Sequence, residues 1–479
     1  MTDAETPPGA RLVLVVAILA SFVSFLDGSI VTVALPAIAR DLGGGVTLQQ
    51  WVVDGYLLTL GSLMLVAGSL SDIFGRVRIL RVGLIAFALT SLLAAFAPDA
   101  GLLIAARALQ GVAGALLVPS SLALITATFT GPAMGRAIGT WTAWTGVAFL
   151  IGPLTGGGLV DTLGWRWVFG LVVLPVVVTL VMMVKLPGDA HRGGAPAGSA
   201  PGADGSAHID VVGAVLAAVG LAGPVFALIE GQRIGFGDPF VIASLVVGVA
   251  CLVAFVLWER RAAHPMMPLR LFSVRSFSVG NLATIGIYAA TSLGTLLIPL
   301  VVQEVGHLPA TVSGLITLPT TVVSLVLSRF VGGLAGRFGP RPFMTVGPLI
   351  TASGFAWMLL TRDPLDVWWQ ILPGVVLFGL GMTITVTPLT STVLSQVRPD
   401  EAGIASAVNN AISRVAGLVA VAFVGVITGG VLDIGGFHRV LVVTAALLVI
   451  SGGVSFAGLR GVPAVRAPSV RAPSSRSPE

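Results

Sequence analysis

Charged side chains are scarce in this sequence. Asp, Glu, Lys and Arg together make up 10% of its 479 residues, whereas soluble proteins carry about 25%. Hydrophobic residues account for 55% of the chain, and the mean hydropathy is +1.00. So few charges cannot cover a water-soluble body of this length, and so many apolar residues exclude disorder for most of the chain. The composition therefore predicts a protein whose solvent is lipid.

Cysteine and histidine are missing from the places where they could carry chemistry. The one cysteine, Cys251, excludes an internal disulfide framework and any multi-cysteine metal site. The five histidines all lie in or beside polar connections, so an intramembrane proton carrier has to be another residue type. No phosphate-binding Gly-Lys loop, metal-ligand cluster or nucleophile–base motif occurs. We therefore expect no catalytic residue, no metal and no cofactor, and a protein that is neither an enzyme nor driven by ATP.

Long apolar runs, in contrast, are abundant. A run needs about 20 apolar residues to cross the hydrocarbon core, and such a run must be helical because lipid offers no partner for backbone groups. We predict an all-α integral membrane protein with 14 transmembrane helices. The predicted spans are residues 11–35, 50–70, 79–97, 101–125, 135–160, 165–186, 210–230, 239–258, 276–302, 309–330, 343–361, 369–395, 404–428 and 437–459.

The positive charges are distributed unevenly between the predicted connections. The formal net charge is +5 and the sequence pI is near 10.5, which in a soluble protein could indicate nucleic-acid binding. If the N-terminus is inside and the chain alternates, most Lys and Arg residues fall on the inside, as membrane topology favours. We therefore predict a multi-pass protein of the plasma (inner) membrane with both termini cytoplasmic. Its surroundings are the lipid bilayer, and no nucleic-acid partner is expected.

Two polar segments and an internal repeat divide the chain. Residues 187–208 are rich in Gly, Ala and Pro, and residues 461–479 form a Pro/Ser/Arg tail. Similar sequences, Gly68 to Arg76 and Gly332 to Pro340, follow the second and tenth spans, which indicates two related halves. The predicted units are an N-terminal six-helix bundle (1–186), a cytoplasmic linker (187–208), two inserted transmembrane helices (209–260), a C-terminal six-helix bundle (261–460) and a disordered cytoplasmic tail (461–479).

Four motifs together are similar to those of a known family. They are Leu26-Asp27-Gly-Ser-Ile30-Val-Thr-Val-Ala-Leu35-Pro36 in span one, Gly68…Asp72…Gly75-Arg76 after span two, Arg107-Ala-Leu-Gln110-Gly111 in span four, and Gly152-Pro153-Leu-Thr-Gly156-Gly157 in span five. The chain resembles the major facilitator superfamily, in particular its fourteen-helix drug:proton antiporters, over nearly its whole length. The resemblance implies two bundles that alternate access across the membrane. In that superfamily the Gly-Pro motif of span five is associated with exporters.

A carboxylate inside an apolar span is costly and is a functional hypothesis by default. At 1.5 Å per residue, Asp27, Asp54 and Arg107 reach a similar depth in the outer half of the membrane. Burial and a nearby arginine act in opposite directions on a carboxylate, and a site balanced between them can exchange a proton. We predict that these three residues couple transport to protons. The alternatives are a static Asp27–Arg107 ion pair and an Asp54 that faces the outer water.

Two glycine-containing segments are candidates for moving parts. Gly68, Asp72, Gly75 and Arg76 are predicted to form a tight cytoplasmic turn that acts as a conformational latch, the alternative being a role in topology alone. The cluster in span five is predicted to pack closely and to kink where the two bundles meet, so that its helix gates the pathway. The alternative is a bent helix that faces lipid. The gating residues are Gly152, Pro153, Gly156 and Gly157.

Candidate pocket residues come from several spans. Trp141 and Trp144 lie inside span five on one face, where they could hold flat, apolar or cationic compounds. Packing against lipid or core is the alternative. Arg414 lies within span thirteen with no acid near it in its own span, and it resembles an arginine found there in the drug:proton antiporters. Tyr56 and Gln110 complete the predicted pocket.

The resulting functional hypothesis is a proton-coupled exporter of drugs or secondary metabolites that works by alternating access. Its expected partners are a small amphipathic or cationic organic substrate and protons, and it is expected to act as a monomer. A lipid or glycolipid flippase on the same scaffold is the first alternative. A solute:proton importer is the second, which the Gly152-Pro153 motif disfavours.

Overall fold

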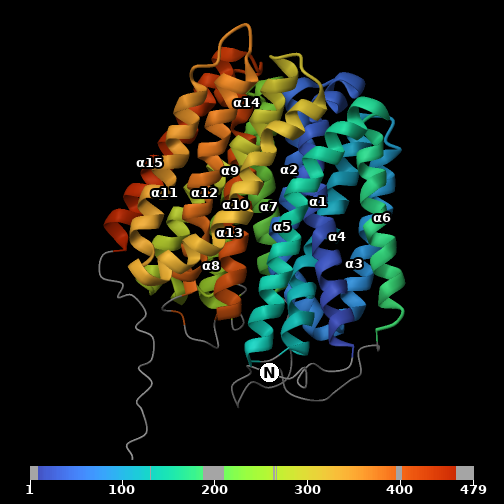
Figure 1. The fold of residues 1–479 in the computed structure, drawn as a ribbon. Coiled ribbons are helices and arrows are strands. Elements are labelled where there is room, and N and C mark those ends of the chain that lie inside the picture. Colours follow the sequence, from blue (N-terminus) through green and yellow to red (C-terminus); the bar gives the residue numbers. More distant parts are fainter. Residues whose placement is uncertain are drawn as a thin grey trace, which may run out of the picture.

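The chain folds into a single array of long helices. The computed structural model describes residues 9–129, 131–186, 210–262, 265, 267–394, 397 and 402–459, and their regular structure is entirely helical (Figure 1). The predicted linker 187–208 and the tail 461–479 lie outside the described residues. The helices are α1 Ala10–Leu42, α2 Gly45–Phe74, α3 Arg76–Ala95, α4 Ala100–Thr128, α5 Gly131–Thr162, α6 Arg166–Met183, α7 Val211–Ile234, α8 Pro239–Arg261, the 3₁₀ turn η1 Leu269–Ser273, α9 Arg275–Glu304, α10 Ala310–Phe338, α11 Pro340–Met358, the π turn η2 Val367–Ile371, α12 Leu372–Leu394, α13 Ala402–Ala422, α14 Val424–Thr428 and α15 Ile434–Gly458.

Twelve stretches of helix in the described residues are long and apolar enough to cross a membrane. The prediction of 14 spans is therefore confirmed only in part, because α2 and α11 are not among the twelve. Helix α11 has only 19 residues, and they include Arg341. In α2, several side chains near the C-terminal end lie outside what the structure describes, and only described residues were compared. The chain is nevertheless a multi-pass membrane protein.

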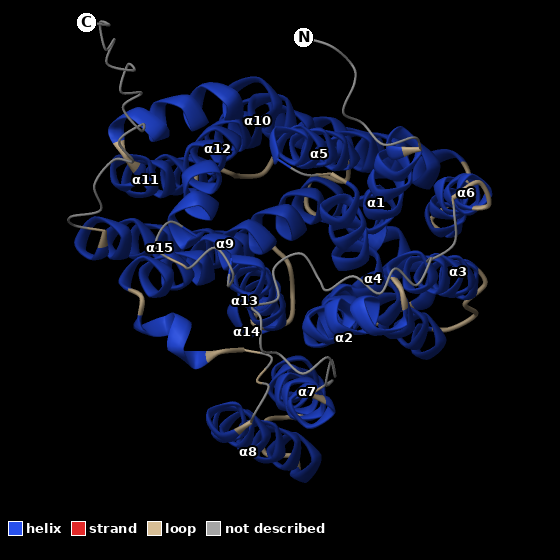
Figure 2. Ribbon diagram, turned by 90° about the horizontal axis from the view of Figure 1, so that it is seen from below, coloured by secondary structure: helices blue, strands red, loops and turns tan. Residues whose placement is uncertain are grey.

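The long helices pack in two groups, and the pair α7 and α8 lies beside them at the edge of the array. Helices α1–α6 pack mainly on one another, and so do α9–α13 with α15. Viewed along the helix axes, α7 and α8 stand together at the edge of the array, where α7 packs on α2, α13 and α14 while α8 packs on α7 (Figure 2). The two groups meet along two seams, α5 with α10 and α2 with α13.

Single glycines connect two of the helix pairs. Gly75 (φ 95°) stands alone between α2 and α3, and Gly339 (φ 80°) stands alone between α10 and α11. Positive φ at both positions is a conformation that glycine adopts without strain. This corrects the predicted latch turn: helix α2 continues through Gly68 to Phe74, so only Gly75 is outside a helix. Arg76 begins α3. The repeat found in the sequence thus encodes one helix–glycine–helix connection used twice.

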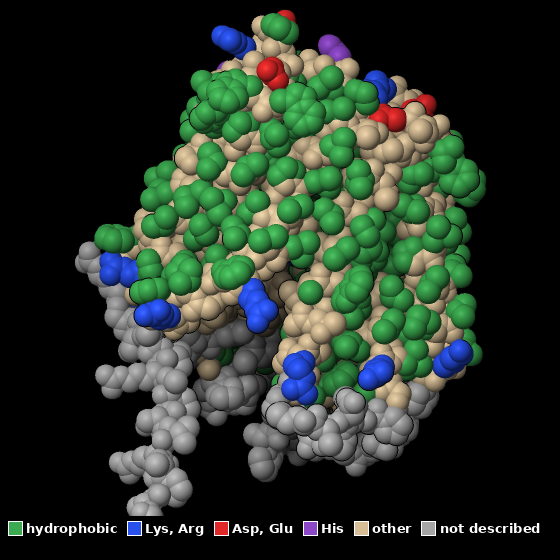
Figure 3. Space-filling model, in the orientation of Figure 1, with side chains coloured by type: hydrophobic (Ala, Val, Ile, Leu, Met, Phe, Trp, Pro, Cys, Tyr) green, Lys and Arg blue, Asp and Glu red, His purple; other side chains and the backbone are tan. Residues whose placement is uncertain are grey.

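Charge gathers at the two ends of the array and leaves the belt between them apolar. In Figure 3 Lys and Arg side chains ring the lower end, and Asp and Glu side chains lie at the upper end. The apolar belt carries many exposed large side chains, among them Leu89, Val178 and Val246, which are 63%, 51% and 61% exposed. Such a belt is what a lipid-facing surface requires.

Candidate functional site

Asp27 and Arg107 form a buried ion pair inside the first helix group. An Arg107 Nη1 donates to Asp27 Oδ2 at 2.7 Å, and the two side chains are 0% and 2% exposed. Gln110 donates to Asp27 Oδ1 at 2.9 Å and to Ser91 Oγ at 2.8 Å, while its own oxygen accepts from Arg107 at 2.6 Å. Arg107 Nε donates to the Val52 carbonyl at 3.0 Å. Helices α1, α2, α3 and α4 therefore meet at one polar network that satisfies both carboxylate oxygens.

Tyr56 packs its ring against Arg107 at the edge of this network. The Arg107 guanidinium carbon lies 4.4 Å from the centre of the Tyr56 ring, within range of a cation–π interaction. The Tyr56 hydroxyl and Ser24 Oγ share a hydrogen bond of 2.9 Å. Tyr56 and Gln110 were predicted to line a substrate pocket, but they are 4% and 0% exposed and belong to this network instead.

Asp54 is buried on α2 in quite different surroundings. It is 0% exposed, and neither carboxylate oxygen has a hydrogen-bond partner in the described part of the chain. Gln50, one turn before it, donates to carbonyls of α13, and Gly61, two turns after it, lies against Arg414 of α13. Asp54 is thus on the face of α2 that meets the second helix group. The alternative of an Asp54 open to the outer water does not describe this conformation.

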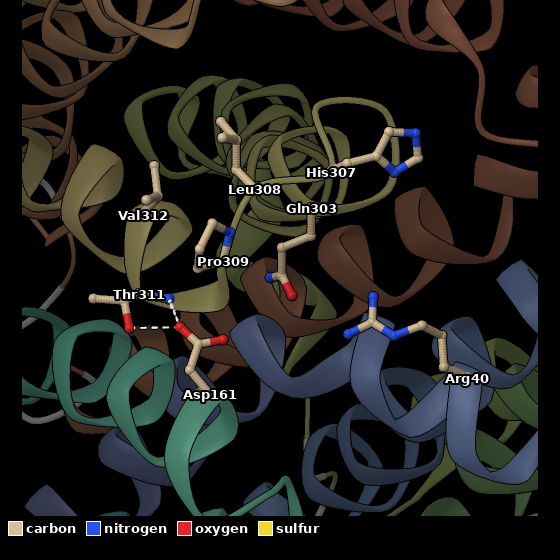
Figure 4. Close-up of a pocket in the computed structure, with 8 residues that line it drawn as sticks. All are labelled: Arg40, Asp161, Gln303, His307, Leu308, Pro309, Thr311 and Val312. Atoms are coloured by element: carbon tan, nitrogen blue, oxygen red, sulfur yellow. Dashed lines mark hydrogen bonds between the residues drawn. The ribbon is translucent and has the colours of Figure 1, made fainter.

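The α5–α10 seam is tied at one end by a carboxylate. Asp161 of α5 accepts from the Ala310 backbone N–H at 3.0 Å, from the Thr311 N–H at 2.8 Å and from the Thr311 hydroxyl at 2.6 Å. These are the first residues of α10, whose free N–H groups and dipole favour a negative charge. Figure 4 shows this contact in the wall of a cavity of about 710 Å³. The cavity is lined by Arg40, Asp161, Gln303, His307, Leu308, Pro309, Thr311 and Val312.

Glutamines tie the two groups at the same end. Gln50 of α2 donates to the Val421 and Ala422 carbonyls at 2.8 and 3.0 Å. Gln303 of α9 donates to the Val33 carbonyl of α1 at 3.0 Å, and Gln49 donates to Glu304. We call this end the closed end and the opposite one the open end.

The glycines of the predicted gating helix mediate close contacts of α5. A Cβ on Gly156 would lie 2.6 Å from Ile30 Cγ1 of α1, and one on Gly157 would lie 2.6 Å from the Ala310 carbonyl of α10. Gly152 faces Ser29, and the Pro153 carbonyl touches Gly314 of α10. The four residues therefore lie where α5 meets both groups, and the alternative of a merely lipid-facing bend does not describe them.

Both seams part toward the open end. Gly139 precedes Gly157 by eighteen residues, five full turns, so it faces the same way, yet no described residue lies within 4 Å of a Cβ built on it. Gly68 follows Gln50 by the same interval on α2, and within the described part of the chain its Cβ position also has no neighbour within 4 Å. Figure 3 shows the two halves separating at the lower end, where the Lys and Arg side chains lie.

We use the name chamber for the space between the two seams beside Phe25, Phe149 and Arg414. The Phe25 ring of α1 is 5.7 Å from the Phe149 ring of α5, and the Arg414 guanidinium carbon of α13 is 5.9 Å from the Phe25 ring centre. Phe149 is 47% exposed. Gly28 is exposed on α1 with nothing within 4 Å of its Cβ position, and Asn410 is exposed one turn before Arg414. Arg414, predicted as a pocket residue, is therefore brought to this chamber.

The remaining predicted residues are spread more widely. Trp141 donates from Nε1 to Ser21 Oγ at 3.0 Å and packs in a small core with α1 and α4. Trp144 is 57% exposed. The backbone of Asp72 is helical, and its side chain lies outside what the structure describes. The predicted latch thus stays a prediction.

Sequence reasoning missed the ties at the closed end. The sequence did not single out Asp161, Gln50 or Gln303, nor the contact in which Glu304 accepts from Gln49. The available signal was their position: each is a polar residue within the first or last turns of an otherwise apolar helix, where backbone groups of a neighbouring helix are unsatisfied. No group of three or more His, Cys, Asp or Glu that could hold a metal occurs among the described residues.

Comparison with known proteins agrees with this geometry. A family model described as Major Facilitator Superfamily matches residues 17–421. The puromycin resistance protein pur8 of Streptomyces alboniger is 36% identical over 427 residues, which cover 87% of this chain and 81% of that protein. The multidrug efflux pump LfrA of Mycolicibacterium smegmatis is 34% identical over 424 residues, covering 88% of this chain and 82% of that pump.

A solved structure shares the fold. The crystal structure of a peptide transporter, POT, in complex with sulfate superposes with a TM-score of 0.68 at 13% sequence identity, covering 95% of each chain. Two groups of membrane helices around a chamber that is closed at one end define a membrane transporter. The chain belongs to the major facilitator superfamily.

Proposed function

We infer that this chain is a proton-coupled exporter of small organic compounds that works by alternating access. The observation that carries the proposal is the asymmetry of the two seams. Asp161 and the glutamines tie them at one end, while the Gly139 and Gly68 faces stand apart at the other. An exporter in this conformation would collect substrate from the open end. The relatives named for puromycin resistance and multidrug efflux support drugs or secondary metabolites as the cargo.

The proposed topology has 14 transmembrane helices, arranged as two six-helix bundles with α7 and α8 inserted between them. The packing of α2 along α4, and of α11 along α12 and α15, supports counting these two helices as spans as well. The arginines at the open end support placing it in the cytoplasm, with both termini inside and the protein in the plasma membrane. We propose that a single chain is the working unit.

Two carboxylates are proposed to couple transport to protons, each in its own way. Asp54 lies in the α2–α13 seam, so a rocking motion would change its access to water, and an ionised carboxylate without a partner is very costly in hydrocarbon. Asp27 is already neutralised by Arg107. A proton on Asp27 would weaken that pair and loosen α1, whose Ile30 packs against Gly156 of the gating helix.

The latch and the gate complete the proposed cycle. Gly68, Asp72, Gly75 and Arg76 are proposed to hold the open end closed in the opposite state, when the cytoplasmic ends of α2 and the second bundle approach. Gly152, Pro153, Gly156 and Gly157 are proposed to let α5 slide on α1 and α10, because glycine contacts leave no side chains to interlock.

The test is transport into inverted membrane vesicles prepared from an efflux-deficient bacterium, using a compound to which the chain gives resistance. Collapse of the proton gradient is expected to abolish uphill uptake even with ATP present. Asp54→Asn and Asp27→Asn are each expected to lose uphill uptake and to keep downhill exchange, because asparagine cannot carry the proton. Asp238→Asn, which keeps the helix cap at the start of α8, is the control. Uptake that survives collapse of the gradient but fails without ATP would reject the proposal.

A further inference from the structure

Arg414 is a cation inside the membrane that has no carboxylate to neutralise it. In the described part of the chain it makes no ion pair and no side-chain hydrogen bond, and its guanidinium carbon is 5.9 Å from the Phe25 ring across the chamber. A charged side chain at this depth is expensive and marks a pathway or a binding site by default. The cost must be offset by something that enters the chamber.

Neither nearby acid is placed to serve as its partner. Both oxygens of Asp27 are already held by Arg107 and Gln110. Asp54 lies seven residues from Gly61, the residue whose Cβ position is 3.5 Å from Arg414 Cβ, and this spacing corresponds to about 10 Å along α2. Helical side chains incline toward the N-terminus of their own helix. The N-terminus of α2 is at the closed end and that of α13 at the open end, so the two side chains incline apart.

The surroundings of Arg414 favour an aromatic ligand. Phe25 and Phe149 lie 5.7 Å apart with their rings tilted by 54°, and they form an apolar wall opposite the guanidinium group. Phe149 is about half exposed and so has ring surface to offer. Aromatic surfaces of this kind stack on flat rings, while a planar guanidinium group binds carboxylates in a bidentate manner.

Building on the export function proposed above, we propose that the chamber binds aromatic anions, compounds with a flat ring and a carboxylate or a similar acidic group. The acidic group pairs with Arg414, and the ring packs on Phe25 and Phe149. A compound with a fixed positive charge is disfavoured, because like charges repel. The expectation of a small amphipathic or cationic substrate is thereby narrowed to amphipathic compounds that carry a negative charge.

Two matched probes test the proposal: 1-pyrenebutyrate and (1-pyrenebutyl)trimethylammonium, which share a ring and a linker and differ in charge. Equilibrium binding is measured on the full-length protein in nanodiscs of uncharged lipid, without a proton gradient. We expect the protein to bind pyrenebutyrate at least about tenfold more tightly, since one hydrogen bond to a charged group contributes enough for that factor. Equal affinity for the two probes, or tighter binding of the cation, overturns the proposal.

Variants assign the preference to one side chain. Arg414→Gln is expected to lose the preference for the anion, and Arg414→Lys to keep part of it, because lysine keeps the charge without the planar fork. Arg136→Gln removes an exposed arginine near the open end and is the matched control. A preference unchanged in Arg414→Gln overturns the assignment; if that variant does not fold, Arg414→Lys decides, since full wild-type preference with lysine also overturns the bidentate contact. Proton coupling plays no part in this measurement, so its failure would leave these results intact.

Discussion

Arg107 and Arg414 are both arginines within apolar helices, but their surroundings differ. Arg107 is 2% exposed within one helix group and is held by a carboxylate, a glutamine and a carbonyl oxygen. Arg414 stands between the groups, half-buried, with its guanidinium carbon 5.9 Å from the Phe25 ring centre and no ion pair among the described residues. The charge of Arg107 is therefore paired within its own helix group, whereas the charge of Arg414 is available to a ligand in the chamber.

The difference shows how a membrane protein separates structure from binding. A buried ion pair is strongly destabilised when one partner is removed, because the other charge is then uncompensated. An unpaired charge at a cavity has no such partner within the protein to lose. Stability and binding measurements on the two arginines should therefore rank them in opposite orders.

The largest effect is expected on stability. Arg107→Gln leaves Asp27 without its cation and is expected to lower the free energy of unfolding by about 3–5 kcal/mol. Arg414→Gln breaks no ion pair and is expected to change it by less than about 1 kcal/mol. Thermal and denaturant unfolding of both purified variants in one detergent gives the comparison. Equal losses in the two variants would remove the distinction between a framework arginine and a binding arginine.

A smaller effect is expected on the balance between the two conformational states when a larger side chain is placed in the α5–α10 seam at the closed end. In Gly157→Val the new Cβ would lie 2.6 Å from the Ala310 carbonyl, and overpacking of this kind costs about 1–3 kcal/mol. The cost falls on the closed seam, so the variant is expected to shift toward the outward-open state about tenfold or more. Gly158→Val, where nothing lies within 4 Å of the Cβ position, is the neighbouring control.

The shift is measured between two exposed positions at the closed end. Spin labels on Phe96→Cys and Val431→Cys, in a background of Cys251→Ala, report the distance between the two groups. The longer distance should be enriched in Gly157→Val and unchanged in Gly158→Val. Identical distributions in both variants would mean that the α5–α10 contact does not set the balance between the two states.

The smallest effect concerns access of water. In the Cys251→Ala background, Arg414→Cys is expected to react with a membrane-impermeant thiol reagent added from the cytoplasmic side, because its side chain faces the chamber. Arg107→Cys, at a 2% exposed position, is expected to react much more slowly. Comparable rates would show that water reaches the Asp27 network as easily as it reaches Arg414, and the proposed separation would then be wrong.

The class of fold could be predicted from the sequence because composition and the length of apolar runs can be read without knowing any tertiary contact. Few charges and long apolar runs are enough to predict membrane helices, and a shared pattern, with Gly at the first position and Phe-Gly near the end, pointed to the equivalence of the segments that end at Arg76 and Pro340. The limits of α2 were predicted too narrowly, as residues 50–70 instead of Gly45–Phe74. The residues left out at its start and end include polar ones, such as Gln49 and Ser71, which an apolar run does not reveal as helix.

Sequence reasoning found those site residues whose burial in hydrocarbon costs much free energy, because such residues are rare in apolar helices. Asp27 and Arg107 stood out because charge in hydrocarbon is rare, and the expected proximity of the two is what the structure has. Tyr56 and Gln110 were misplaced because a polar side chain in a span can face either a pocket or a buried network, and periodicity does not distinguish them. Asp161 was missed because its partner is a helix N-terminus, a feature without a side-chain signature.

The one-residue connections at Gly75 and Gly339 bear on how the chain is made. Two helices joined by a single glycine cannot enter a membrane far apart in time or place, since the first cannot finish crossing without bringing the start of the second to the interface. If both helices of each pair span the membrane, as in the proposed topology, each pair inserts as a hairpin. Arg76, Arg78 and Arg341 directly follow the two turns, and positive charges at such positions favour a cytoplasmic hairpin tip. A longer, uncharged connection at either glycine is therefore expected to impair membrane insertion of the helix pair more than it impairs transport by the folded protein.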